Sequence, residues 1–223
     1  MHRWIKRTVG RFMAAVCAGI MAGCGAGSPS VTVSQGETLA RYPFDDVSTW
    51  EFYNDSERGI FFGITDGEYR ARIVNEALIW TLNGQAHTDV IMQVDTLQFS
   101  TDEQNGYGLI CRASANQDGD GYYFLVSGDG NFTIRRGVSG VVEPIIPWTR
   151  SAAVAGGQNP NRLRVVCVGD YLALYINGQF VAEARDSRYQ RGYAGITAVV
   201  PGDRSVEVTF DDLTIWDGSL GEP

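Results

Sequence analysis

From Leu39 onward, apolar and polar residues alternate in short runs separated by turn residues. The runs are rich in Val, Ile, Tyr, Phe and Thr and almost none has a helical period, so they indicate strands. Asn-Gly and Asp-Gly pairs between the runs accept the positive φ angles of tight hairpins, most clearly within 172–183. The predicted strands include Thr88–Phe99, Gly106–Ala113, Tyr122–Ser127, Phe132–Arg136, Arg162–Val168, Tyr171–Ile176, Phe180–Ala184 and Val206–Trp216. The pattern predicts one all-β domain, an antiparallel β-sandwich over residues 39–217, followed by a short tail at 218–223.

The period of two also assigns side chains of the central strands to two faces. Leu109, Cys111 and Ala113 suit the core. The opposite face is then expected to carry Arg112, Tyr123, Ser127, Thr133 and Arg135. Aromatic and guanidinium groups on one surface can bind a sugar by stacking and hydrogen bonding, whereas the alternative is a merely solvated sheet face.

Trp148 is the tryptophan best placed to stack on a ligand. It follows Pro147 in a predicted connection, whereas Trp216 ends the last predicted strand and is expected to pack. We therefore group Trp148 with Arg112, Tyr123 and Arg135 as candidate ligand-binding residues.

The start of the chain has the features of a targeting signal. Four cationic residues precede an apolar run, Phe12–Ala22, that is about half as long as a bilayer span. The segment Met21-Ala22-Gly23-Cys24 resembles a bacterial lipobox, in which cleavage before the cysteine leaves that residue to carry lipid. We expect a lipoprotein signal peptide at 1–23 and a flexible tether at 24–38, with lipid on Cys24 anchoring the chain outside the cytoplasm to the cell membrane or outer membrane. An ordinary signal peptide with an incidental Cys24 is the alternative.

Charge and composition exclude several functions. The chain has a net charge of −8, and without residues 1–23 it has 14 Arg, no Lys and 26 acidic residues, a net charge of −12. An acidic surface repels phosphate backbones, so no nucleic acid partner is expected. His87 is the only histidine after the leader, which excludes a multi-histidine metal site, and the absence of Lys excludes Schiff-base chemistry.

Cys111 and Cys167 remain after the expected leader and the lipidation site. Both lie in apolar strand patterns at positions that should face the core. Outside the cytoplasm such a pair can form a disulfide, and two buried free thiols are the alternative.

Several of these segments resemble the concanavalin A-like and laminin-G-like jelly rolls. They are Gly106–Ser114, Tyr122–Arg135, Asn161–Val166, Leu172–Ala182, Gly192–Ile196 and Phe210–Trp216. The nearest relatives look like the bacterial 3-keto-disaccharide hydrolase domains, also described as glycoside-hydrolase-16-like, and the resemblance covers residues 39–217. It implies a jelly-roll fold, but its turn and core motifs leave the activity open.

Catalysis is not favoured by the acidic residues. Retaining laminarinase-type relatives carry a Glu-x-Asp-x-x-Glu strand that sets two carboxylates on one face, and this chain has no such run. The remaining candidates are scattered: Asp95, Glu143, Glu183, Asp211 and Asp212. No catalytic residue is assigned.

A structural calcium site is a further expectation. Some jelly rolls of this type bind Ca²⁺ near the terminal strands, where two similar tetrapeptides of this chain, 44–47 and 210–213, are expected to meet. The candidate ligands are Asp45, Asp46, Asp211 and Asp212. No cofactor is expected to be required.

The sequence thus predicts an anchored extracytoplasmic jelly roll that binds a glycan or another cell-envelope polymer without catalysis. Two alternatives remain: a sugar-processing enzyme acting through an Asp/Glu pair, and a structural or protein-interaction module.

Overall fold

The computed structural model describes residues 27–221, which form strands and turns with no helix among them. The strands are β1 (Val33–Tyr42), β2 (Tyr53–Asp55), β3 (Ile60–Thr65), β4 (Glu68–Val74), β5 (Ala77–His87), β6 (Val90–Gln98), β7 (Gly106–Ala113), β8 (Gly121–Val126), β9 (Asn131–Val138), β10 (Val141–Arg150), β11 (Pro160–Val168), β12 (Tyr171–Ile176), β13 (Gln179–Arg185), β14 (Gly192–Val200) and β15 (Ser205–Leu220). Within residues 27–221 no helix is long and apolar enough to cross a membrane. The expected leader and Cys24 lie outside the described residues.

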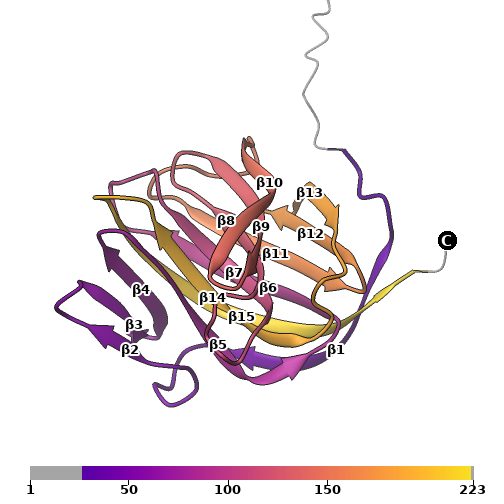
Figure 1. The fold of residues 1–223 in the computed structure, drawn as a ribbon, viewed down its shortest axis with the longest axis horizontal. Coiled ribbons are helices and arrows are strands. Elements are labelled where there is room, and N and C mark those ends of the chain that lie inside the picture. The colour runs from indigo at the N-terminus through magenta and orange to yellow at the C-terminus, as the bar shows by residue number, and fades with distance from the viewer. Residues whose placement is uncertain (1–26, 222–223) are drawn as a thin grey trace, which may run out of the picture.

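The strands form two antiparallel sheets that pack face to face (Figure 1). Sheet A has nine strands in the order β13-β12-β11-β6-β15-β4-β3-β2, with β1 paired to β15. Sheet B has six strands in the order β10-β9-β8-β7-β14-β5. This arrangement confirms the predicted all-β antiparallel sandwich.

One large apolar cluster fills the space between the sheets. Leu109 and Phe124 enter it from alternate positions of sheet B, and Leu172 and Phe210 enter it from sheet A. Burying a side chain of this size stabilises the fold by about 1.5–3 kcal/mol. A smaller cluster that includes Tyr123 lies on the outer face of sheet B, the face turned away from sheet A.

A disulfide bond joins the two sheets across this core. It links Cys111 of β7 in sheet B to Cys167 of β11 in sheet A, with the Cα atoms 6.8 Å apart. The inward positions of both cysteines follow from the alternation of their strands.

Strand pairing at the chain ends extends beyond the boundaries expected from the sequence. β1 begins at Val33 and pairs with β15 as far as Leu220, and the two strands lie side by side (Figure 1). Residues 33–38 therefore belong to the sheet and not to the tether, and 218–220 do not form a free tail. Residues 33–38 of β1 are mostly exposed and polar, so they have no apolar alternation, and the backbone hydrogen bonds to β15 hold them in place.

Candidate functional site

A cavity of about 560 Å³ lies on the outer face of sheet B. This volume lies within the usual range for small-molecule sites. Its apolar lining consists of Leu78, Leu125, Val142, Val199, Pro201, Tyr123 and Trp148. Its polar lining consists of Gln104, Asn105, Ser127, Asp129, Asn131, Arg135 and Arg204. An apolar surface with a few polar groups is the usual composition of a ligand site.

The alternation of β8 and β9 builds the centre of this cavity. Tyr123, Leu125 and Ser127 alternate with residues of the main core, so their side chains lie on the outer face. Tyr123 pairs with Arg135 in the register of the two strands, which brings the phenol and the guanidinium to neighbouring positions. The Tyr123 hydroxyl donates to the carbonyl of Gly119 at 2.8 Å, and burial raises the pKa of this phenol.

Trp148 supplies the exposed aromatic group of the cavity. It lies in β10, not in a loop, and 41% of its surface is exposed. A Cβ atom on Gly106 would come within 3.2 Å of the edge of the indole at Cη2, so the ring rests on a position that has no side chain. The register of β10 against β9 shifts between Ile146 and Thr149, on either side of Trp148, as at a β-bulge, and such a bulge can redirect a side chain.

Arg135 is the half-buried cation of the cavity. Its Nη2 donates to the carbonyl of Val142 at 3.1 Å, and it forms no ion pair within residues 27–221. Burial lowers the pKa of this guanidinium, which nevertheless remains charged at any physiological pH. Most of its five N–H donors are thus left for solvent or a ligand.

Asn105 lines the cavity with an unsatisfied acceptor. The residue is 3% exposed, and its Nδ2 donates to the carbonyls of Asp102 at 2.7 Å and Ser205 at 3.3 Å. Its Oδ1 is buried and has no hydrogen-bond partner in the described part of the chain. A buried polar atom without a partner is unfavourable by about 1–3 kcal/mol.

Asp129 is the only carboxylate among the lining residues of this cavity. Its side chain accepts a hydrogen bond from Ser127 Oγ, and its backbone carbonyl accepts one from Arg150 Nη1 at 2.9 Å. At the other side, Arg204 donates to the side chain of Gln104. The sequence alone did not identify Asn105, Gln104 and Arg204 as cavity residues. They lie in two connections, before β7 and after β14, which meet at one cavity because β7 and β14 are neighbours in sheet B.

The prediction that Arg112 shares this ligand-facing surface is wrong. Its φ angle of 51° accompanies a β-bulge: Ala113 and Ile110 pair with Tyr193 and Gly195, so two residues of β7 face one of β14. The bulge reverses the alternation, so Ala113, expected in the core, packs on the outer face instead.

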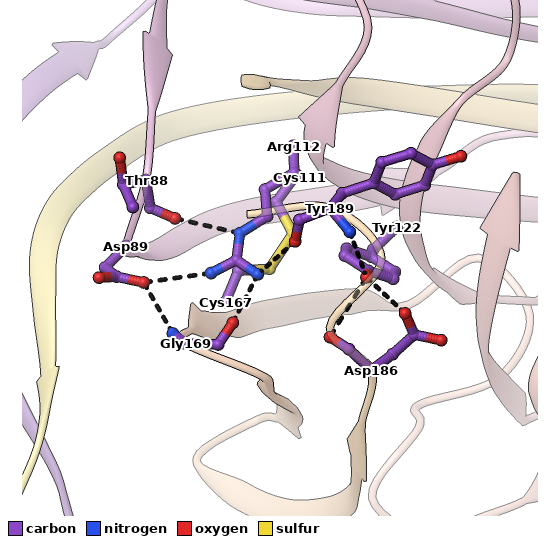
Figure 2. The surroundings of a disulfide bond; sticks show 9 residues. All are labelled: Thr88, Asp89, Cys111, Arg112, Tyr122, Cys167, Gly169, Asp186 and Tyr189. Atoms are coloured by element: carbon purple, nitrogen blue, oxygen red, sulfur yellow. Dashed lines mark hydrogen bonds and ion pairs between the residues drawn. A yellow bond between two sulfur atoms is a disulfide. The ribbon is translucent and has the colours of Figure 1, made fainter. Parts of the chain in front are cut away.

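The guanidinium of Arg112 is a structural clamp (Figure 2). It is 1% exposed and donates from Nε to the carbonyl of Thr88 at 3.0 Å, and from Nη1 to those of Gly169 and Tyr189, both at 2.7 Å. Its Nη2 pairs with Asp89 at 3.1 Å. Three connections of the fold are thereby tied to β7, next to the disulfide.

The four aspartates proposed for calcium are only partly brought together. Burial, followed by the charges of Asp212, Asp95 and Asp45, raises the pKa of Asp211, although the amide hydrogen bond from Asp212 opposes this. Asp212 pairs with Arg41 at 2.9 Å. Asp46 accepts hydrogen bonds from the amide and hydroxyl of Ser48, at 2.9 and 2.8 Å. Within residues 27–221 no cluster of three or more His, Cys, Asp or Glu residues is placed to hold a metal ion, and calcium binding stays a prediction.

No protein-family model and no curated protein matches the chain. Solved structures do match. The carbohydrate-binding module CBM66 from Bacillus subtilis superposes with a TM-score of 0.63 at 16% identity, over 77% of this chain and 98% of that one. A Bacillus subtilis protein of unknown function with a galectin-like fold gives 0.58 at 14% identity, over 84% and 99% of the chains. A candidate glycosyl hydrolase from Parabacteroides distasonis gives 0.53 at 13% identity, over 78% and 90%.

At these identities the similarity shows the fold alone, so the relation to 3-keto-disaccharide hydrolases stays an expectation. The described chain is a concanavalin A-like jelly-roll β-sandwich, similar to a carbohydrate-binding module and to a candidate glycosyl hydrolase.

Proposed function

We propose that the chain is a non-catalytic glycan-binding module and that the cavity on the outer face of sheet B is its binding site. The observation that carries this proposal is the exposed indole of Trp148 beside the polar groups of Asn105 and Arg135 in one preformed hollow. Aromatic faces stack on the C–H surface of sugar rings, while amide and guanidinium groups hydrogen-bond the hydroxyls. The carbohydrate-binding module with the same fold supports this assignment.

We also propose that lipid on Cys24 anchors the module outside the cytoplasm, on the cell membrane or outer membrane. The disulfide between Cys111 and Cys167 suits an oxidising compartment. Val31 and Val33 pack on the outer face of sheet A, and the amide of Ser30 donates to Glu183 of β13 at 2.8 Å. The first described residues therefore lie on sheet A, the sheet opposite the cavity, and this supports a cavity that faces away from the membrane.

Lipidation of Cys24 is tested by labelling cells with a palmitate analogue and comparing the wild-type chain with the Cys24→Ala variant. We expect label and membrane retention in the wild type and loss of both in the variant. Secretion of an unlabelled wild-type protein would favour the ordinary signal peptide.

The enzymatic alternative depends on a pair of carboxylates. Asp129 lines the binding cavity, and both Asp129 and Glu103 line an adjacent hollow of about 610 Å³. Glycosidases use two carboxyl groups on opposite sides of the scissile bond. If this alternative holds, Asp129 and Glu103 are the residues to test.

A protein-interaction role is the other alternative. Val47 and Phe52 are 72% and 68% exposed, and Tyr53 is 39% exposed, at the end of the sandwich formed by β2. These side chains do not line the binding cavity. Glycan binding that survives their replacement would separate this surface from the proposed function.

The central test is a glycan-binding screen of the purified protein, with and without EDTA, followed by analysis of products for every glycan that binds. We expect binding without turnover, and about tenfold weaker binding by Trp148→Ala. Phe99→Ala is the matched control, because Phe99 is 40% exposed and does not line the cavity. Turnover that is lost in Asp129→Asn would replace this proposal with the enzymatic one.

A further inference from the structure

The charge of the binding cavity is opposite to the charge of the chain. The protein carries a net charge of −8, but the cavity is lined by two arginines and one carboxylate. The carboxylate of Asp129 accepts a hydrogen bond from Ser127 Oγ and forms an ion pair with neither Arg135 nor Arg204. A local excess of positive charge in a concave surface concentrates anions there.

Arg135 differs from the paired arginines of the fold. Six other arginines in residues 27–221 form ion pairs: Arg41, Arg70, Arg112, Arg136, Arg162 and Arg185. Arg135 is half-buried in the cavity with a single backbone carbonyl as its acceptor. Removing a charge from water is costly unless an opposite charge or several hydrogen bonds compensate, so this site favours an anionic partner.

The guanidinium is also held in a defined place. The hydrogen bond to Val142 of β10 and the register position opposite Tyr123 of β8 fix it on the outer face of sheet B, on the strand next to the edge strand β10. A planar fork with free N–H groups fits a carboxylate or a sulfate through two parallel hydrogen bonds. A flexible rim cation would not provide this geometry.

Trp148 adds an apolar group to the same cavity. The cavity thus offers a cation for an acidic group and an indole for a ring face. Acidic sugars carry both features on one residue.

We infer that the cavity selects glycans bearing an anionic group, a uronate carboxylate or a sulfate ester, and that Arg135 holds this group. This inference rests on the proposed glycan-binding function of the same cavity. It assigns Arg135 to specificity, whereas Trp148 contributes to binding of any ring.

The test compares ligands that differ only in charge. Galacturonate oligosaccharides and their methyl esters form one pair, and a sulfated galactan oligosaccharide and its desulfated form make the other. At low salt we expect the purified protein to bind the acidic member of one pair at least about tenfold more tightly, because a charge-assisted hydrogen bond replaces a neutral one. The pair that shows the difference identifies the anion, and the difference should shrink as salt is added.

Variants of the cavity arginines test whether Arg135 causes the selectivity for acidic glycans. Arg135→Gln should reduce the acid-to-ester ratio to about one, and circular dichroism with a cooperative thermal transition reports that the variant is folded. Arg58→Gln is the matched control, because Arg58 is exposed, lies outside the cavity and makes no ion pair in the described residues. It should retain the full ratio. Arg204→Gln is a second variant, which removes the positive charge of the other arginine that lines the cavity.

The outcomes separate the two proposals. Equal affinity for both members of each pair would overturn the anionic selectivity and keep the glycan-binding function. A wild-type ratio in Arg135→Gln would overturn the role of Arg135. Failure of the wild-type protein to bind any acidic or neutral glycan would overturn the proposed function itself.

Discussion

Gly106 lies directly beneath the edge of Trp148. A Cβ atom at residue 106 would be 3.2 Å from Cη2 of the indole and 2.7 Å from Cγ1 of Val199. Both side chains line the cavity, so the missing side chain at the start of β7 is part of its shape.

Gly106→Ala is therefore expected to displace Trp148 or Val199 and to weaken glycan binding. Overpacking of this kind destabilises a fold by about 1–3 kcal/mol, so the melting temperature should fall as well. Calorimetric titration with a bound glycan and thermal unfolding measure the two effects. Gly84→Ala is the control, because a Cβ atom there meets nothing within 4 Å. Unchanged affinity in Gly106→Ala, with a lowered melting temperature, would mean that the packing of Trp148 and Val199 on Gly106 does not define the site.

The disulfide is expected to contribute strongly to stability. Its cysteines are 56 residues apart in the sequence, and closing a loop of this length restricts the unfolded chain by about 4 kcal/mol in the entropy model. Urea unfolding of the wild type with reductant should match that of Cys111→Ala/Cys167→Ala, and both should have lower midpoints than the oxidised protein. An unchanged midpoint under conditions where peptide mapping shows full reduction would contradict this prediction.

The Arg112 clamp is expected to stabilise the fold without affecting the ligand. Arg112→Gln leaves the carbonyls of Thr88, Gly169 and Tyr189 without their donor, which should lower the free energy of unfolding by about 3 kcal/mol. The glycan affinity of the folded variant should equal that of the wild type.

The matched control for Arg112 is Arg191→Gln, because Arg191 is exposed and forms no ion pair in residues 27–221. It should change neither the urea midpoint nor the affinity. Loss of glycan binding in folded Arg112→Gln would restore the ligand-binding role predicted from the sequence.

Arg112 also shows which part of the site cannot be predicted from the sequence. The period of two places Tyr123 and Arg135 on one face, and both line the cavity. The same rule fails at Arg112, because a non-glycine residue with a positive φ angle gives no signal in the sequence before the bulge is seen. Local alternation thus predicts which face a side chain occupies within a regular strand, and it fails at a β-bulge.

Long-range pairing accounts for the other differences. In the sequence, Asn105 is part of an Asn-Gly pair that is typical of a turn. The side chain is buried because its Nδ2 donates to the carbonyls of Asp102 and Ser205, which lie in two segments far apart in the sequence. Residues 33–38 of β1 have no apolar pattern, so their place beside β15 depends on backbone pairing. The core, in contrast, could be predicted, because burial itself determines where the apolar residues recur.

Asp186 is expected to make stability depend on pH in the acid range. Burial alone would raise the pKa of this carboxyl, but three contacts lower it below its ordinary value of 3.8. They are the hydrogen bond from Tyr122 at 2.6 Å (Figure 2), the hydrogen bond from the amide of Arg188 at 2.9 Å and the ion pair to Arg136. A folded-state pKa below the unfolded one adds stability that is present above the unfolded pKa. That stability is lost as the pH falls through the folded pKa.

The urea midpoint of the wild type should therefore decrease between about pH 5 and pH 3, as unfolded carboxyls take up protons more readily than folded Asp186. Asp186→Asn should be less stable at neutral pH, because the ion pair to Arg136 is lost, and should depend less on pH in the acid range. Asp203→Asn, at an exposed loop position, should keep the wild-type pH dependence. If Asp186→Asn retains the full acid dependence, the Tyr122–Asp186–Arg136 network does not carry it and other carboxylates do.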